Sequence, residues 1–147
     1  DLKNGHSYEQ AFNVMRRLRL PYSQAQEMFR RIVFNVVVRN QDDHTKNISF
    51  LMDSSGQWSL SPAYDMGFAY NPLGAWTATH QMSINGKFDN ITRADLLSLA
   101  NANNIKNASE IIDQVCEATA GWPELAKNCG VPQKMIDGIV PHMLLSI

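Results

Sequence analysis

Apolar residues recur at helical spacing over the first forty residues of the chain. A Ser-x-x-Gln pattern beginning at Ser7 is typical of a helix capping box, and apolar positions three or four apart follow it. This run ends before Pro21, because a proline disfavours helical backbone in the residue ahead of it. The same Ser-x-x-Gln pattern begins at Ser23 and precedes a second run. We therefore predict two antiparallel helices that bury their Met and Phe stripe in the core and lead the chain to Asn40.

The pattern then changes from helical spacing to alternation. Residues 41–47 contain no apolar side chain, which predicts a loop. Two short stretches of alternating apolar and polar residues follow, and the turn-forming residues 53–56 separate them. This arrangement predicts a β-hairpin over roughly 48–61. Residues 66–90 are rich in Gly, Asn and Pro, and we expect them to be irregular.

Helical signals return in the last third of the chain. Thr92 and Asn107 are each followed three residues later by an acidic residue, which predicts two further helix starts. Pro123 bends or restarts the second of these helices. Gly130 and Pro132 separate a last helix with apolar positions at 135, 136, 139 and 140. The predicted fold class is mainly α, around one small β-hairpin.

Composition supports a single globular domain. The chain has 147 residues, of which 44% are hydrophobic and 18% are charged, and we read residues 1–147 as one domain. No stretch approaches the roughly 18 consecutive apolar residues of a membrane span. The chain begins at Asp1 and stops on the apolar run 141–147. We therefore expect it to be a piece of a longer protein.

Charge and cysteine content narrow the function classes further. The net charge of −1 conceals an excess of arginine in residues 1–40, which we interpret as a solvated helix face, with a nucleic-acid surface as the alternative. Cys116 and Cys129 have no metal-ligand spacing, so we predict two buried thiols in a reducing compartment and no zinc site. Three histidines are isolated in the sequence and receive no role: His6, His80 and His142.

Three oxygen-bearing side chains flank the predicted hairpin. Asn47 precedes its first strand, Asp65 follows its second strand, and Asp42 lies five residues before Asn47. Because paired strands lie about 4.8 Å apart, we expect all three side chains to meet at the open end of the hairpin. Two carboxylates and one amide oxygen suit Mg²⁺ better than zinc. Taken singly, each is also an ordinary loop residue that caps backbone amides.

Together these spacings match a known chemistry. An Asp-x-x-x-x-Asn loop followed across a hairpin by Asp is the catalytic arrangement of kinase-type phosphoryl transfer. In that arrangement Asp42 accepts the proton of the acceptor hydroxyl, while Asn47 and Asp65 hold Mg²⁺. Lys46 then places a positive charge near the γ-phosphate, and His44 supports the loop or the Asp42 carboxylate.

The loop and the residues after the hairpin also resemble a particular family. Residues 34–50 contain the pattern Asp-x-His-x-Lys-Asn, and residues 60–65 end in Pro-x-Tyr-Asp. Together they strongly resemble the HipA family of serine/threonine kinases, the toxins of bacterial toxin–antitoxin pairs. The likeness extends over most of the chain, through residues 7–10, 18–21 and 80–87.

The resemblance implies both a fold and a set of roles. It implies the helical carboxy-terminal lobe of a kinase-like fold, related to the lipid kinases, with the hairpin at the active site. It makes Asp42 the proton acceptor and places Mg²⁺ on Asn47 and Asp65. The residues that it places around the ATP cosubstrate are His44, Lys46, Asn47, Tyr64 and Asp65.

Partners and location are implied in the same way. We expect a protein substrate phosphorylated on Ser or Thr, and a HipB-like helix-turn-helix antitoxin. DNA contact is expected only indirectly, through that antitoxin. We expect the bacterial cytoplasm and no membrane association.

The chain departs from a complete kinase in one respect. No Gly-rich phosphate loop and no strand lysine precede Asp42, so we predict that the amino-terminal lobe that grips ATP is absent and that this piece alone is inactive. Two alternatives remain open: a kinase of small molecules or lipids on the same lobe, and a non-catalytic module that binds antitoxin or DNA. A metal phosphohydrolase using Asp42, Asp43, His44 and Asp65 ranks last, because His44 has no partner at i+4.

Overall fold

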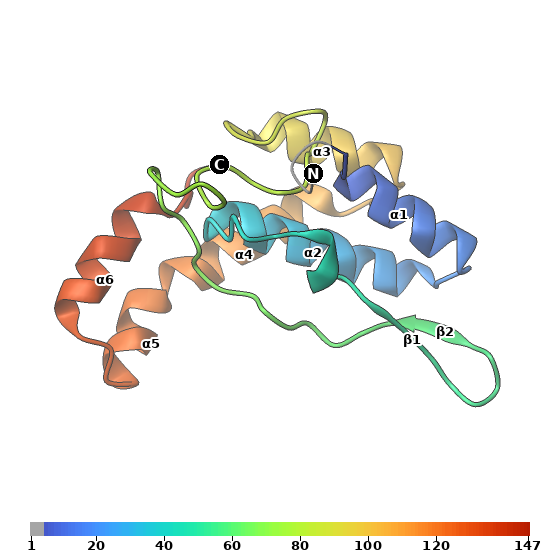
Figure 1. Ribbon diagram of the computed structural model, residues 1–147, viewed down its shortest axis with the longest axis horizontal. Coiled ribbons are helices and arrows are strands. Elements are labelled where there is room, and N and C mark those ends of the chain that lie inside the picture. Colours follow the sequence, from blue (N-terminus) through green and yellow to red (C-terminus); the bar gives the residue numbers. More distant parts are fainter. Residues whose placement is uncertain (1–4) are drawn as a thin grey trace.

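The computed structural model describes residues 5–147, so Asp1 lies outside the described residues. The protein is mainly α-helical with one two-stranded antiparallel sheet, as predicted (Figure 1). The elements are, in chain order, α1 Tyr8–Arg17, α2 Tyr22–Val37, the 3-10 helix η1 Thr45–Asn47, β1 Phe50–Met52, β2 Trp58–Leu60, α3 Arg93–Ala102, α4 Ala108–Ala120, α5 Trp122–Asn128, α6 Gln133–Ile139 and the 3-10 helix η2 Val140–His142.

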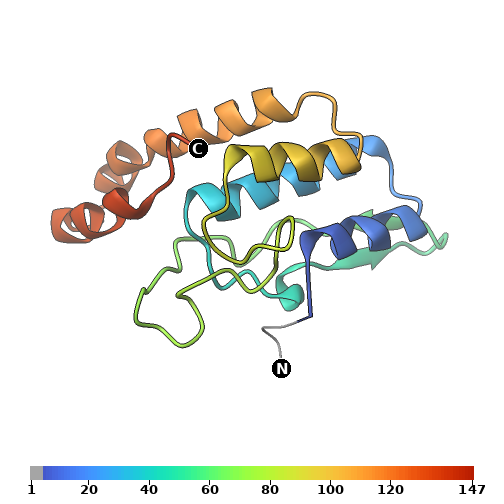
Figure 2. The ribbon, with the colours of Figure 1, turned by 90° about the horizontal axis from the view of Figure 1, so that it is seen from above.

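Helix α2 is the centre of the fold. It packs against α4 on one side and α1 on the other, and Figure 2 shows it between those two helices. Its apolar face has no exposed surface at five positions: Phe29, Ile32, Val33, Val36 and Val37. Burying each such side chain contributes about 1.5–3 kcal/mol, so this stripe anchors the end of α2 from which the polar loop departs.

The helix starts follow the predicted capping pattern at two of four sites. Ser7 and Thr92 form complete capping boxes. In each, the N-cap side chain accepts from the backbone amide three positions later, and the side chain at that later position accepts from the N-cap amide. The prediction at Ser23 is wrong, because α2 already begins at Tyr22, behind the extended backbone of Pro21. Asn107 does occupy the N-cap of α4, but its side-chain oxygen accepts a hydrogen bond from Gln26 instead of a first-turn amide.

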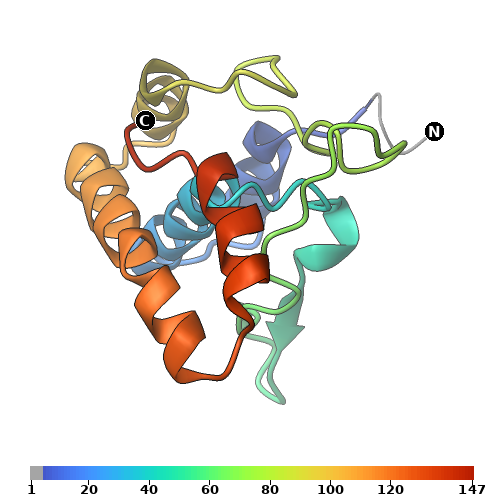
Figure 3. The same ribbon diagram turned by 90° about the vertical axis from the view of Figure 1, so that its left-hand side faces the viewer.

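The last two helices form a pair at the end of the molecule away from the hairpin (Figures 1 and 3). Pro123 lies in the first turn of α5, so it restarts the helix as predicted. Helix α6 buries Ile136, whereas Met135 on the same helix is exposed, against the predicted apolar stripe. After α6 the chain returns to the core, where the Leu144 amide donates to the Val37 carbonyl at 2.8 Å.

The hairpin pairs Phe50 with Leu60 and projects from the helical body (Figure 1). Its turn is closed by the Asp53 carboxylate, which accepts from the amides of Ser55 and Gln57, and by Gly56 at a positive φ of 83°. At the other end the pairing continues to a hydrogen bond from the Ser61 amide to the Ser49 carbonyl. The open end of the hairpin therefore lies directly beside the polar loop.

The prediction of two buried thiols is wrong. Cys129 is exposed just after α5, and Cys116 is half-buried on α4. Burial raises the pKa of the Cys116 thiol, and the negative charge of Asp113 adds to this against the opposing charge of Arg93. Both cysteines are free.

Candidate active site

The polar loop leaves α2 through a sharp change of direction. Arg39 adopts a left-handed backbone with φ 54°, which is uncommon for a residue other than glycine. The next amide, of Asn40, turns back to the Asn35 carbonyl at 2.8 Å. The loop then pairs with a distant segment, because Gln41 donates to the Ala69 carbonyl at 3.1 Å and Ala69 donates to Arg39 at the same distance. The loop is thus held at its start by backbone bonds on both sides.

A tight turn follows between Asp42 and Asn47. The Asp42 carbonyl accepts from the His44 amide at 2.9 Å and from the side-chain amide of Asn47 at 3.1 Å. Helix η1 is closed by the Asn47 amide, which donates to the His44 carbonyl at 3.0 Å. Asn47 therefore uses its nitrogen to close the turn, and its side-chain oxygen remains available to a ligand.

The segment after the hairpin is attached to this turn. Tyr64 donates its hydroxyl to the Lys46 carbonyl at 2.7 Å, and the side-chain amide of Asn40 donates to the Asp65 carbonyl at 3.3 Å. Asp65 itself has a left-handed φ of 54°. Backbone strain of this kind persists only where the surroundings hold it, and it is often found at functional sites.

One pocket contains four of the six residues singled out from the sequence. Its walls include His44, Asn47, Tyr64 and Asp65. Asp42 and Lys46 do not contribute to these walls, although both belong to the same turn. Of the three oxygen-bearing residues predicted to meet, Asn47 and Asp65 share this pocket, whereas Asp42 contacts Asn47 only through its main-chain carbonyl.

The functional groups of this site make few bonds within the protein. Over residues 5–147 neither the Asp42 nor the Asp65 carboxylate, nor the Lys46 ammonium, has a hydrogen bond or ion pair. The Nδ1 atom of His44 is buried and has no partner. His44 therefore does not support the Asp42 carboxylate with its side chain, which corrects that interpretation of the sequence.

The pocket is too small to enclose a nucleotide. Its volume is about 30 Å³, whereas small-molecule sites usually measure about 300–1,000 Å³. The pocket is therefore a shallow floor and not an enclosed ligand cavity.

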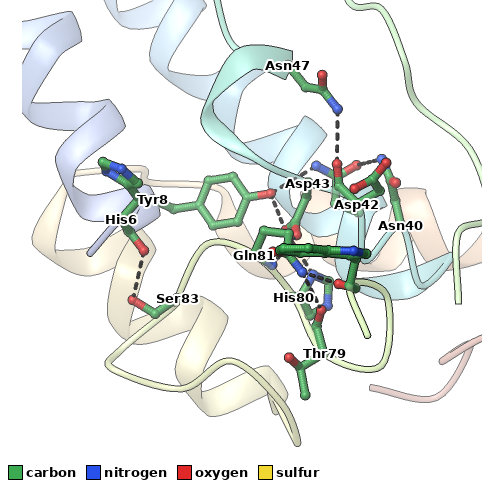
Figure 4. A network of polar contacts seen from close by, with 12 residues as sticks. His6, Tyr8, Asn40, Asp42, Asp43, Asn47, Thr79, His80, Gln81 and Ser83 are labelled. Carbon is green, nitrogen blue, oxygen red and sulfur yellow. Dashed lines mark hydrogen bonds and ion pairs between the residues drawn. The ribbon is translucent and has the colours of Figure 1, made fainter. Parts of the chain in front are cut away.

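Sequence reasoning missed a buried network directly beneath the loop (Figure 4). Asp43 is only 2% exposed, and its carboxylate contacts Tyr8, His80 and the backbone of Gln81. Burial, and then the charge of Asp43, raise the pKa of the Tyr8 phenol well above its ordinary value. No local signal identifies these contacts, because the partners lie 35 to 38 residues from Asp43 in the chain.

The arginine-rich first part of the chain does not form one solvated face. Arg30 donates to Gln114, and Arg31 pairs with Glu27 and also donates to the Ser61 carbonyl at the base of the hairpin. The Arg39 guanidinium lies 4.4 Å from the centre of the Tyr70 ring. Arg16 also donates to Asn103 and Asn13. Four of the six arginines therefore make contacts within the fold, which weakens the nucleic-acid alternative.

The described side chains do not favour the hydrolase alternative. Among the described residues no group of three or more His, Cys, Asp or Glu side chains is arranged to hold a metal ion. A two-metal hydrolase depends on such a group. A kinase magnesium site does not depend on such a group, because one or two protein oxygens and the substrate phosphates complete it.

Within residues 5–147 no helix is both long and apolar enough to cross a membrane.

Comparison with known proteins gives two similarities. Residues 1–122 match the family model of the HipA-like C-terminal domain, so the match includes the loop, the hairpin and α1 to α4. The serine/threonine-protein kinase toxin HipA of Shewanella oneidensis is 35% identical over 66 residues. That alignment covers 45% of this chain and 15% of the relative.

Proposed function

Because the chain belongs to the HipA-like C-terminal domain family, we propose that it carries the phosphoryl-transfer half of a serine/threonine-protein kinase site. The observation that supports this most directly is the placing of Asn47 and Asp65 on the walls of one pocket while Asn47 closes the turn at Asp42. These are the three positions that kinase chemistry needs. The relative is itself called a serine/threonine-protein kinase toxin.

The proposed role of Asp42 is to accept the proton of the acceptor hydroxyl. Its carboxylate has no partner among residues 5–147, and its backbone is held by two hydrogen bonds to the carbonyl. A base that is fixed through its main chain and free at its side chain is placed to receive a proton from a substrate. General-base catalysis of this kind contributes about 10²- to 10⁴-fold.

Asn47 and Asp65 would hold Mg²⁺ on ATP. The donor set fits, since an amide oxygen and a carboxylate are hard ligands and neither has a hydrogen-bond partner in the part of the chain that the structure describes. When bound, the metal supplies positive charge to the transferring phosphate. Lys46 and His44 would line the phosphates, and the Tyr64 hydroxyl holds the Lys46 backbone in the turn.

The remaining partners follow from the same proposal. ATP is the cosubstrate, and the acceptor is a Ser or Thr hydroxyl of a protein. A HipB-like helix-turn-helix antitoxin is the proposed regulatory partner, and any DNA contact is made through it. Because the pocket provides only the floor of a nucleotide site, the other contacts to ATP are proposed to come from a region that precedes this chain in a longer protein.

The test is transfer of labelled γ-phosphate by the full-length protein from which this chain comes. We expect label on Ser or Thr of a protein, and loss of about 10²-fold or more in the Asp65→Asn variant, since removing one stabilising charge has an effect of that size. Asp137→Asn on exposed α6 is the matched control and should retain the wild-type rate.

Each contrary result has a distinct meaning. Label on a lipid or small molecule, with none on protein, would favour the other kinase class. No transfer together with tight binding of the antitoxin or DNA would favour the non-catalytic module. A folded Asp65→Asn variant that transfers phosphate within a few-fold of wild type would remove Asp65 from the site.

A further inference from the structure

Asp43, the residue after the proposed base, has a carboxylate enclosed by the fold. Its Oδ2 atom accepts from the Tyr8 hydroxyl at 2.7 Å and lies 2.8 Å from Nδ1 of His80. Its Oδ1 atom accepts from the Gln81 amide at 2.7 Å. His80 is 3% exposed, so this cluster is closed to solvent. Figure 4 shows the Tyr8 hydroxyl and His80 approaching Asp43 from different segments, directly behind Asp42.

These contacts join three parts of the chain at one point. Tyr8 comes from the first turn of α1, and His80 and Gln81 come from the irregular segment between β2 and α3. Asp43 follows Asp42 directly in the loop. A buried carboxylate with short bonds to three donors has a closely defined position, because any displacement leaves a buried polar group unsatisfied.

The same network continues to the other half of the site. Asn35 donates to the Tyr8 hydroxyl at 3.0 Å, and its own oxygen accepts from Asn40 at 2.9 Å. The side-chain nitrogen of Asn40 also lies 3.3 Å from the Asp65 carbonyl. One unbroken chain of hydrogen bonds therefore runs from Asp43 to Asp65, through residues that line the pocket.

We propose that Asp43, held by Tyr8 and His80, is a positioning residue that fixes the Asp42 turn relative to Asp65. It does not touch the reacting groups and acts through the backbone of its neighbours. The catalytic part of this inference rests on the proposed function, whereas the fixing of the turn does not. A displacement of about 1 Å at a reacting group can cost about 10²-fold in rate.

The chain offers matched controls for each change. Tyr22→Phe removes a tyrosine hydroxyl that accepts from the Lys106 amide and has no bond to the loop. Tyr22 is exposed whereas Tyr8 is buried, and the variant is paired with Tyr8→Phe. Asp95→Asn changes a second buried carboxylate, which is 3% exposed and bonded to Lys87, Asn85 and Thr92 at the start of α3. It is paired with Asp43→Asn, and it separates general destabilisation from an effect on the turn.

Hydrogen exchange of the 147-residue chain tests the positioning without any assay of activity. The reporters are the amides of His44, Asn47 and Ile48, which are bonded inside the turn and not to Asp43. We expect them to exchange at least about tenfold faster in Tyr8→Phe and Asp43→Asn than in the paired controls, because the bonds of the turn open more often once its anchor is weakened. If these amides in folded Tyr8→Phe exchange within about twofold of their rate in Tyr22→Phe, the proposal is overturned. This comparison remains decisive even if Asp43→Asn does not fold.

His80 provides a rescue test in the full-length protein. His80→Asn keeps a nitrogen donor near the position of Nδ1, whereas His80→Ala removes it. We expect His80→Ala to lower the transfer rate by about ten- to hundredfold, as is typical for residues that orient ligands from behind, and His80→Asn to recover most of it. Equal rates in folded His80→Ala and wild type overturn the catalytic part. If the turn amides exchange faster in the variants but the full-length wild-type protein transfers no phosphate, the positioning role of Asp43 stands and the proposed function is rejected.

Discussion

The side-chain amide of Asn47 donates to the main-chain carbonyl of Asp42 at 3.1 Å, and no bond joins the two side chains. The turn between them is therefore built on backbone groups of Asp42. Among residues 5–147 its carboxylate has no hydrogen-bond partner. The main chain of Asp42 therefore holds the turn, while its side chain is the group that is proposed to react.

Asp42→Ala should consequently reduce transfer while it leaves the turn intact. We expect a loss of about 10²- to 10⁴-fold in the rate of phosphoryl transfer, as for other general bases. Affinity for Mg-ATP in the full-length protein should remain within a few-fold, because the proposed metal ligands are Asn47 and Asp65. Calorimetric titration with Mg-ATP measures this directly, and a parallel loss of affinity would move Asp42 from the base to the metal site.

The 147-residue chain alone should bind nucleotide very weakly. Its pocket of about 30 Å³ supplies only a floor, and kinase sites also need backbone amides and a lysine from the opposite lobe. We expect a dissociation constant for Mg-ATP of about millimolar or weaker, which corresponds to roughly 4 kcal/mol, and no transfer above background. Titration of the chain, followed by addition of the proposed ATP-gripping region as a separate polypeptide, tests this. Transfer by the isolated chain would show that the nucleotide site is misplaced.

Asp95 should make stability depend on acid pH. Burial alone would raise the pKa of this carboxyl, but its bonds to Lys87, Asn85 and Thr92 outweigh burial and hold the pKa well below the ordinary value of 3.8. Because the pKa is lower in the folded state, the stabilisation is fully present above pH 3.8 and declines as the pH falls below it. Urea unfolding at several pH values should therefore show Asp95→Asn costing stability near pH 7 and progressively less in acid. A constant difference across this range would mean that the carboxylate is not charged in the fold.

The two cysteines should react at very different rates. Cys129 is exposed, whereas Cys116 is half-buried and has a raised pKa, which lowers its thiolate fraction at neutral pH. With a thiol reagent such as a maleimide, we expect Cys129 to be labelled first, and Cys116 to follow slowly and to accelerate as the pH rises. Mass spectrometry of Cys129→Ser and Cys116→Ser separates the two rates. Equal rates in the two variants would contradict the packing of α4.

The sequence by itself determined the helices, the hairpin and the identity of the polar loop. Helical spacing and the capping boxes at Ser7 and Thr92 depend on atoms within about one turn, so the local pattern already contains their hydrogen bonds. Alternation and the turn at Asp53 define the hairpin in the same way. The Asp-x-x-x-x-Asn spacing also brings Asn47 to the Asp42 carbonyl through a single short turn.

Tertiary structure alone decided what surrounds that loop. Asp43 and His80 look like an ordinary loop residue and an isolated histidine, yet they meet at 2.8 Å because the start of α1 and the segment around residue 83 pair with each other next to the loop. The same holds for Cys129, whose exposure depends on how α5 and α6 pack against the body. Contacts between residues more than thirty positions apart depend on the packing of whole elements, and no pattern within a short window of the sequence encodes them.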